Sequence, residues 1–146
     1  MPATFTPQHL TYLAEAYYLF FTTLRGDQMP LPTPVWFVVE GDTILTYSNP
    51  QALKVKNIEQ HPLVALSHNR DVEGEEYLII TGEAHIDPAA PTPAHHAAYL
   101  QKYREGITRI DMTVESYDAY FSLPIRITPH RVRMYEISPE EFLPKE

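Results

Sequence analysis

The sequence predicts a mainly β protein, an antiparallel barrel with accessory helices, and three observations predict this class. At least six segments rich in β-branched and aromatic residues are bounded by turn-forming residues. Helical segments are inserted among them without the regular strand-helix alternation that is typical of a parallel sheet. The 146 residues fit one domain, because a chain of this length buries enough surface for a single core. We expect one domain over residues 1–146, with a short N-terminal helix, a barrel over about 18–137 and an extended C-terminal tail.

The chain is predicted to begin with a helix and one strand. Thr6 and Pro7 are typical of a helix start, and apolar residues then recur at three- and four-residue spacing as far as Tyr17. Tyr18–Leu24 is rich in aromatic residues and threonine and ends at the turn residues Gly26 and Asp27, which predicts a strand.

A hairpin is the best-supported element of the sequence. Pro32 and Pro34 have no amide hydrogen, so their segment suits the start or edge of a strand and not its middle. The pattern then predicts one continuous strand over Val35–Glu40, a tight turn at Gly41-Asp42, and an antiparallel return strand over Thr43–Tyr47.

The second half of the chain continues with strands and helices in mixed order. Asn49 as N-cap and Pro50 at the first helical position predict a short helix that ends before His61-Pro62. Two β-rich segments follow and are expected to pair, and Pro129 is expected to break or bulge the last strand. The predicted elements are strands Leu63–His68 and Tyr77–Ile86, a helix from Thr92-Pro93 to about Arg109, a shorter helix over Val114–Phe121, and a strand over Ile125–Ile137.

Composition and charge exclude several classes of function. The chain has no cysteine, which excludes disulfides, a thiolate nucleophile and cysteine-ligated metals. Its formal net charge of -8 disfavours nucleic acid as the main partner, because phosphate binding depends on clustered Lys and Arg. The N-terminus lacks the pattern of a signal peptide and the longest apolar run is too short to span a bilayer, so we expect a cytoplasmic protein with no membrane partner.

The predicted helix at Asn49 is a candidate anion site. The first amides of a helix have no intrahelical partner and carry partial positive charge, and Ser48 and Asn49 add side-chain groups. Lys54 lies one turn into this helix, on the face of Pro50, and Lys56 lies roughly 200° around it from Lys54 at ~3.6 residues per turn. The alternative is that both lysines are ordinary solvated charges on a surface helix.

The segment PLPTPVWFVVEGDTILTYSNPQALKVKNIEQHPLVALS resembles the pyridoxamine 5′-phosphate oxidase-like split-barrel family. The segments Tyr99–Tyr103 and Arg126–Arg133 are similar to the branch of probable deazaflavin (F420)-dependent enzymes. The resemblance covers about residues 18–135. It implies an FMN-binding type of split antiparallel β-barrel, a bound F420 or FMN, and a homodimer whose cofactor cleft lies between two subunits.

The same resemblance implies which residues bind the cofactor. Its ring would lie along the strand segment around Trp36, and its phosphate at the predicted helix start. Core packing is the alternative for Trp36, and a solvent-exposed strand face is the alternative for the C-terminal arginines. The cofactor-binding residues implied are Pro34, Val35, Trp36, Tyr47, Ser48, Asn49, Lys54, Lys56, Asn57, Arg131 and Arg133.

Few residues suggest catalysis by side chains. The adjacent His95 and His96 point to different faces of a helix, no zinc or iron signature is present, and neither a Ser-His-Asp pattern nor a phosphate-binding glycine loop occurs. The aromatic residues at Tyr99 and Tyr103 suit a packing stripe. Tyr117, Tyr120 and Phe121 are candidates for an apolar substrate pocket. We therefore predict no metal site and leave the catalytic residues unassigned.

The function expected is hydride transfer between bound F420 or FMN and an unidentified small or planar substrate. An enzyme whose cofactor supplies the redox chemistry needs only to bind, orient and shield it, which explains the lack of an acid/base pair. The alternative of another class is a non-catalytic flavin or haem carrier with the same fold.

Overall fold

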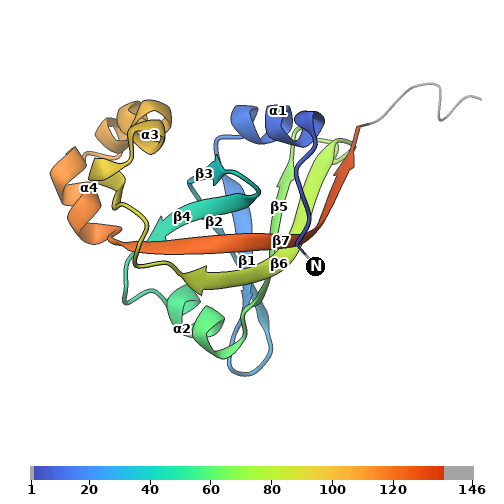
Figure 1. Cartoon of the computed structure of the whole chain (residues 1–146), viewed down its shortest axis with the longest axis horizontal. Coiled ribbons are helices and arrows are strands. Elements are labelled where there is room, and N and C mark those ends of the chain that lie inside the picture. Colours follow the sequence, from blue (N-terminus) through green and yellow to red (C-terminus); the bar gives the residue numbers. More distant parts are fainter. Residues whose placement is uncertain (1, 137–146) are drawn as a thin grey trace, which may run out of the picture.

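The computed structural model describes residues 2–136, which form one curled antiparallel sheet with helices around it (Figure 1). The seven strands lie side by side in the order β2-β1-β5-β6-β7-β4-β3. None of the helices within residues 2–136 is long and apolar enough to cross a bilayer. The strands are β1 Leu19–Leu24, β2 Pro30–Val35, β3 Phe37–Glu40, β4 Thr43–Ser48, β5 Leu63–Asn69, β6 Tyr77–Ile86 and β7 Leu123–Tyr135.

The two edge strands of this sheet follow each other in the chain and are joined by Trp36. Val35 at the end of β2 pairs with Leu19, whereas Phe37 at the start of β3 pairs with Thr46 on the opposite edge. One straight strand cannot pair with both edges, so the prediction of a continuous strand over Val35–Glu40 is wrong. The edge strands β2 and β3 are not paired by hydrogen bonds, and the connection between them is the single residue Trp36. We call this junction the seam.

The proline-rich segment forms the edge strand β2. The pairs of β2 with β1 place Pro34 opposite Phe20 and Pro32 opposite Thr22. Proline nitrogens carry no hydrogen, and on an edge strand they can face away from the neighbouring strand at no cost in hydrogen bonds. The prediction of an edge position for Pro32 and Pro34 is confirmed.

The hairpin of β3 and β4 is confirmed, as is the pairing of β5 with β6. Gly41 has a φ of 57°, which suits the tight turn between β3 and β4. On β7 a bulge follows Pro129, because Thr81 of β6 faces Arg131 while Gly82 faces Pro129. A Cβ on Gly82 would lie 2.1 Å from the carbonyl oxygen of Thr128, so only glycine fits there. The expected end of this strand, Ile137, lies outside the described residues.

Helices lie around the curled sheet, above it, below it and to one side (Figure 1). The first, α1 (Pro7–Glu15), starts at a capping box in which Thr6 and His9 satisfy each other's backbone amides. The predicted helix from Thr92 is instead a short 3-10 turn, η1 (Pro93–His95), followed by α3 (Ala97–Arg109), whose N-cap is His96. The remaining helices are α2 (Leu53–Gln60) and α4 (Val114–Tyr120).

The core consists of two clusters on either side of β3. Phe37 belongs to the larger cluster, inside the barrel beneath α1, and Val38 belongs to the smaller one beneath α3 and α4. This division follows from the alternation of side chains along a strand. The stripe predicted at Tyr99 and Tyr103 is buried in the smaller cluster together with Ile107, which confirms its packing role.

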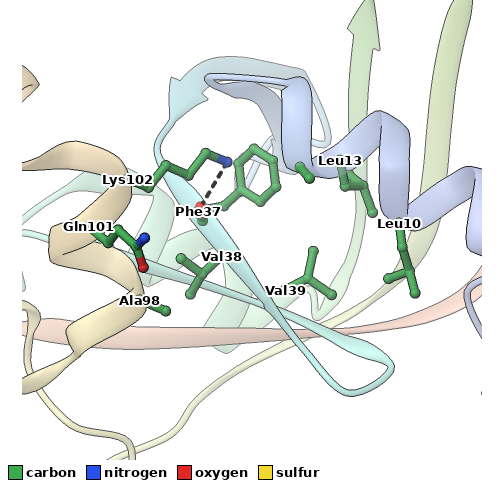
Figure 2. A pocket seen from close by; sticks show the side chains of 9 residues that line it. Leu10, Leu13, Phe37, Val38, Val39, Ala98, Gln101 and Lys102 are labelled. Carbon is green, nitrogen blue, oxygen red and sulfur yellow. Dashed lines mark hydrogen bonds between the residues drawn. The ribbon is translucent and has the colours of Figure 1, made fainter.

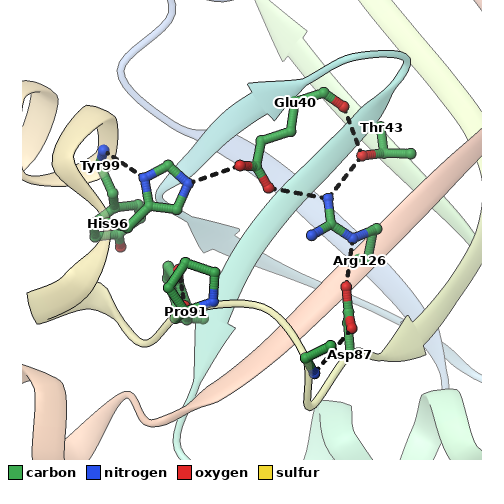
Figure 3. Close-up of polar contacts among 9 residues, drawn as sticks. Glu40, Thr43, Asp87, Pro91, His96, Tyr99 and Arg126 are labelled. Atoms are coloured by element: carbon green, nitrogen blue, oxygen red, sulfur yellow. Dashed lines mark hydrogen bonds and ion pairs between the residues drawn. The ribbon is translucent and has the colours of Figure 1, made fainter.

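An ion-pair network fixes the start of α3 to the β3–β4 hairpin (Figure 3). Arg126 on β7 donates to Glu40 (3.1 Å) and to Asp87 (2.7 Å), and Glu40 also contacts Nε2 of His96 (3.1 Å). Nδ1 of His96 accepts from the amide of Tyr99, so the neutral ring donates from Nε2 to Glu40. The hydrogen bond from Arg126 lowers the pKa of Asp87.

Candidate functional site

A pocket of about 170 Å³ opens beside the seam. The seam contributes Trp36, β4 contributes Tyr47, α2 contributes Lys54 and the α3–α4 region closes the other side. Five of the predicted cofactor-binding residues, from three separate parts of the sequence, therefore share one pocket. Its lining residues are Pro34, Val35, Trp36, Tyr47, Lys54, Ile110, Tyr117 and Phe121.

Lys54 supplies the charge of the pocket. It is the second residue of α2, and burial lowers the pKa of its amine. No ion pair joins Lys54 to an acidic side chain within residues 2–136. A desolvated ammonium without a counter-ion gains most from an anionic ligand group. The position of Lys54 is thus suited to a phosphate or carboxylate.

The corner before α2 differs from the predicted helix start. The helix begins at Leu53, with Ala52 as an N-cap that has no side-chain hydrogen bond. The side chain of Asn49 instead accepts from the amide of Gln51 (2.8 Å) and donates to the carbonyl of Tyr120 (3.1 Å). Asn49-Pro50 therefore starts a turn, because the asparagine oxygen competes successfully for the local amide. The prediction that Asn49 caps this helix is wrong.

Ser48 lies next to this corner but is fully buried. Its exposed fraction is 2%, and its hydroxyl donates to the carbonyl of Asn49 at 2.9 Å. In this conformation neither Ser48 nor Asn49 lines the pocket. Lys54 alone of the expected phosphate-binding groups does so.

Aromatic rings form one wall of the pocket. The indole of Trp36 stacks on Tyr103 and on Tyr117, with centroid distances of 4.8 and 5.8 Å. The hydroxyl of Tyr117 lies 2.6 Å from that of Tyr99, and burial raises the pKa of Tyr117 to about 12. Trp36 thus both packs in the aromatic cluster and lines the pocket. Such a wall can stack against a planar ring.

Two of the three aromatic residues proposed from the sequence for an apolar pocket, at and after α4, line this pocket. Tyr117 and Phe121 line the pocket, whereas Tyr120 is 54% exposed and does not. Sequence reasoning missed Ile110, which follows the last turn of α3. Its spacing of three residues from the buried Ile107 was the available signal.

The other predicted site residues lie elsewhere. Asn57 is buried and donates to the hydroxyl of Thr23 at 2.9 Å, so it holds α2 against β1. Lys56 is exposed on α2. Arg131 and Arg133 are exposed on the outer face of the sheet, beside a hollow formed with Ile79 and Thr81. Within one chain they are not close to the pocket: Arg131 is seven residues along β7 from Pro124, the partner of Tyr47, or roughly 23 Å.

The described lining of the pocket contains no histidine and no carboxylate. Acid-base catalysis by a His or Asp/Glu pair is therefore not built into these walls. An apolar, aromatic cavity with one ammonium is suited to hold a planar ligand with an anionic group. A nearby hydroxyl, that of Thr33, is buried with no hydrogen-bond partner in the described part of the chain.

Comparison with known proteins agrees with this geometry. The family model described as pyridoxamine 5′-phosphate oxidase matches residues 5–141. A comparison with functionally curated proteins gave no match.

Solved structures share the fold at low sequence identity. An F420 reductase is 23% identical, with 88% of this chain and 98% of that chain covered and a TM-score of 0.64. A conserved hypothetical protein from Mycobacterium tuberculosis is 15% identical, with 99% and 92% covered and a TM-score of 0.74. The haem storage protein HutZ from Vibrio cholerae is 13% identical, with 91% and 96% covered and a TM-score of 0.63. The match of the family model over nearly the whole chain, on a curled split barrel, shows that this protein belongs to the pyridoxamine 5′-phosphate oxidase family.

Proposed function

We propose that the protein is an oxidoreductase that binds F420 or FMN in the pocket beside the seam and transfers hydride to or from a small or planar substrate. The observation that carries this proposal is the position of Lys54, a partly desolvated ammonium in a pocket whose other walls are apolar or aromatic. It has no ion pair in the described part of the chain. The bound cofactor would supply the hydride chemistry.

The residues of this chain would bind and orient the cofactor. Lys54 would hold its phosphate, the backbone of Val35 and Trp36 would lie along its ring, and Tyr117 and Phe121 would exclude water from it. Tyr47 is less free to take part, because its hydroxyl already donates to the carbonyl of Pro91. Burial also raises the pKa of Tyr47, so this phenol stays protonated at neutral pH.

Haem carriage is the alternative function, since a haem storage protein shares the fold. The lining of the pocket disfavours it. Histidine is absent from the described lining, and burial disfavours the phenolate form of Tyr117 that would ligate iron.

We further propose a homodimer with a cofactor cleft between the subunits, in the cytoplasm. The outer face of the sheet exposes Phe20, Leu63 and Ile79, which are apolar and unusual on a free sheet surface. Pro34 links this face to the pocket, because it lines the pocket and lies opposite Phe20 in the sheet. A second subunit on this face would bring its Arg131 and Arg133 towards the cofactor.

The test of the cofactor proposal is a titration of the purified protein with FMN, F420 and haem. Binding is followed by absorption of the added compound and by the fluorescence of Trp36, the single tryptophan of the chain. We expect saturable binding of FMN or F420 and roughly tenfold weaker binding by Lys54→Met, the loss typical of one charge-assisted contact. Lys56→Met is the matched control, because Lys56 is exposed on the same helix. Binding of haem alone, or equal affinity in both variants, would overturn the proposal.

The dimer proposal is tested by mixing two variants that are each expected to bind the cofactor weakly. Lys54→Met removes the charge of one chain's pocket, and the double variant Arg131→Gln, Arg133→Gln removes the charges expected from the other chain. Mixed dimers would contain one intact site and regain part of the binding. A monomer in size-exclusion chromatography with light scattering, or no recovery on mixing, would contradict it.

A further inference from the structure

A second cavity, separate from the cofactor pocket, lies along the free edge of the sheet. It has a volume of about 470 Å³ and is a groove between α1 and α3, with β3 as its floor (Figure 2). Leu10, Leu13 and Ala14 form the wall on α1. Ala98, Gln101 and Lys102 form the wall on α3. We call it the edge groove.

The floor of the edge groove presents backbone groups of an edge strand. The amide of Phe37 donates to the hydroxyl of Tyr103 (2.8 Å). The single hydrogen of this hydroxyl is shared between the carbonyl of Tyr17 (2.8 Å) and that of Phe37 (2.9 Å), so both backbone groups of Phe37 point away from β4. Alternation along an antiparallel strand directs the amide and carbonyl of Val39 to the same free edge. There they have no hydrogen-bond partner within residues 2–136. Val39 can therefore pair with one residue of an added strand.

Lys102 closes one end of the edge groove. Its Nζ lies 3.8 Å from the centre of the Phe37 ring and 3.4 Å from the carbonyl oxygen of Phe37 (Figure 2). An ammonium has three donors, and this long hydrogen bond satisfies one of them. No ion pair joins Lys102 to an acidic side chain in the described part of the chain. Burial also lowers the pKa of Lys102 to about 8, as expected for a poorly solvated amine.

We propose that the edge groove binds the C-terminal end of an extended peptide, which adds a short antiparallel strand to β3 and places its terminal carboxylate on Lys102. The spacing agrees with this arrangement. Lys102 contacts Phe37, which is two residues from Val39, or roughly 7 Å along the strand. A peptide residue that pairs with Val39 would then be followed, two residues later, by a terminal residue opposite Phe37. Tyr103 and Lys102 block the edge beyond this point, so the chain must end there.

The alternation of side chains gives the expected sequence preference. Phe37 and Val39 face the cluster beneath α1, and Val38 faces the cluster beneath α3. The last and third-last peptide residues would therefore contact Leu10 and Leu13 and should be apolar. The second-last residue would face Ala98 and Gln101 and should be small or polar. This is recognition by strand addition, with backbone bonds for affinity and alternate side chains for specificity.

The probe is a fluorescein-labelled hexapeptide, Gly-Ser-Gly-Val-Ser-Val, with a free C-terminal carboxylate, and binding is measured by fluorescence anisotropy. We expect the carboxylate form to bind about tenfold more tightly than the C-terminal amide, because only the carboxylate pairs with Lys102. In Lys102→Met this preference should fall below twofold, and in the control variants Lys56→Met and Lys54→Met it should persist. Methylation of the amide nitrogen of the third-last residue should weaken binding, since it removes the donor to Val39.

A second measurement uses the unaltered protein, so it does not depend on whether the variants fold. In the unaltered protein, the peptide should slow hydrogen exchange at the amide of Val39 and shift its NMR resonance. Equal binding of the carboxylate and amide peptides, no binding up to millimolar concentration, or an unchanged Val39 amide would overturn the proposal.

Discussion

The indole of Trp36 lies parallel to the phenol ring of Tyr103, with 2° between the ring planes and 4.8 Å between the centroids. Because Trp36 also lines the pocket beside the seam, its fluorescence reports on that pocket. We predict that FMN quenches this emission by more than half at saturation and that inorganic phosphate alone leaves it almost unchanged. Trp36→Phe should retain binding, measured by flavin absorption, with an affinity lowered about threefold to tenfold by the loss of stacking area. Unquenched Trp36 in the complex would place the flavin elsewhere.

A second prediction concerns Gly106, where α3 approaches the seam. A Cβ at this position would lie 2.1 Å from the Tyr17 hydroxyl and 2.9 Å from the end of the Trp36 indole. Gly106→Ala gains up to about 1 kcal/mol of helix propensity, while overpacking costs about 1–3 kcal/mol. We expect a net loss of about 1 kcal/mol in urea unfolding and a shifted Trp36 emission. Stabilisation with unchanged emission would show that Tyr17, which is partly exposed, simply moves aside.

A third prediction concerns the network of Arg126. Arg126→Met leaves Glu40 and Asp87 without their shared cation in a partly buried place. We expect the free energy of unfolding to fall by about 2–3 kcal/mol. Arg131→Met, on the exposed part of the same strand, should change it by less than about 0.5 kcal/mol. Similar losses in the two variants would contradict the assigned role.

The same network gives a pH dependence. The pKa of Asp87 is lowered in the folded protein, so its contribution to stability is present above the ordinary pKa of an aspartate, near pH 4, and is lost as the pH falls through the folded value. Urea unfolding from pH 6 to pH 2 should show this loss in the unaltered protein. The difference in stability between the unaltered protein and Arg126→Met should shrink towards the acid end. A constant difference would show that the Asp87 pair contributes nothing.

A further pH dependence, of the same sign but at alkaline pH, follows from Lys102. Its folded pKa of about 8 is below the ordinary value of a lysine, so the folded state releases this proton first. Stability should therefore rise between about pH 8 and pH 10, relative to Lys102→Met, by about 1 kcal/mol after allowance for solvent screening. Guanidinium unfolding at several pH values measures the difference. A difference that does not change with pH would show that the amine is fully solvated.

The sequence predicted the strands and most helices because their signals are local. Capping residues, turn glycines and alternating apolar residues determined α1, the β3–β4 hairpin and the β5–β6 pair. The break at Trp36 was missed because nothing local marks it: the residues on either side suit a strand, and only their pairing with opposite edges separates them.

Local signals also explain why only some of the predicted site residues lie in the pocket. Lys54 and Tyr47 line the pocket, whereas Asn49 forms a turn and bonds to Tyr120, far away in the sequence. Arg131 and Arg133 share a strand face as expected, but strand length carries them away from the pocket of their own chain.

The seam has a mechanical consequence. Two hairpins, β1–β2 and β3–β4, are joined by the single residue Trp36. The indole of Trp36 also lines the pocket, where it can contact a bound ligand. Separating these hairpins requires the indole to move. A ligand that holds the indole in place should therefore stabilise the barrel against this separation. Insertions at position 36 should consequently loosen the barrel and empty the cavity in one step, while the loop over residues 70–76 should tolerate them.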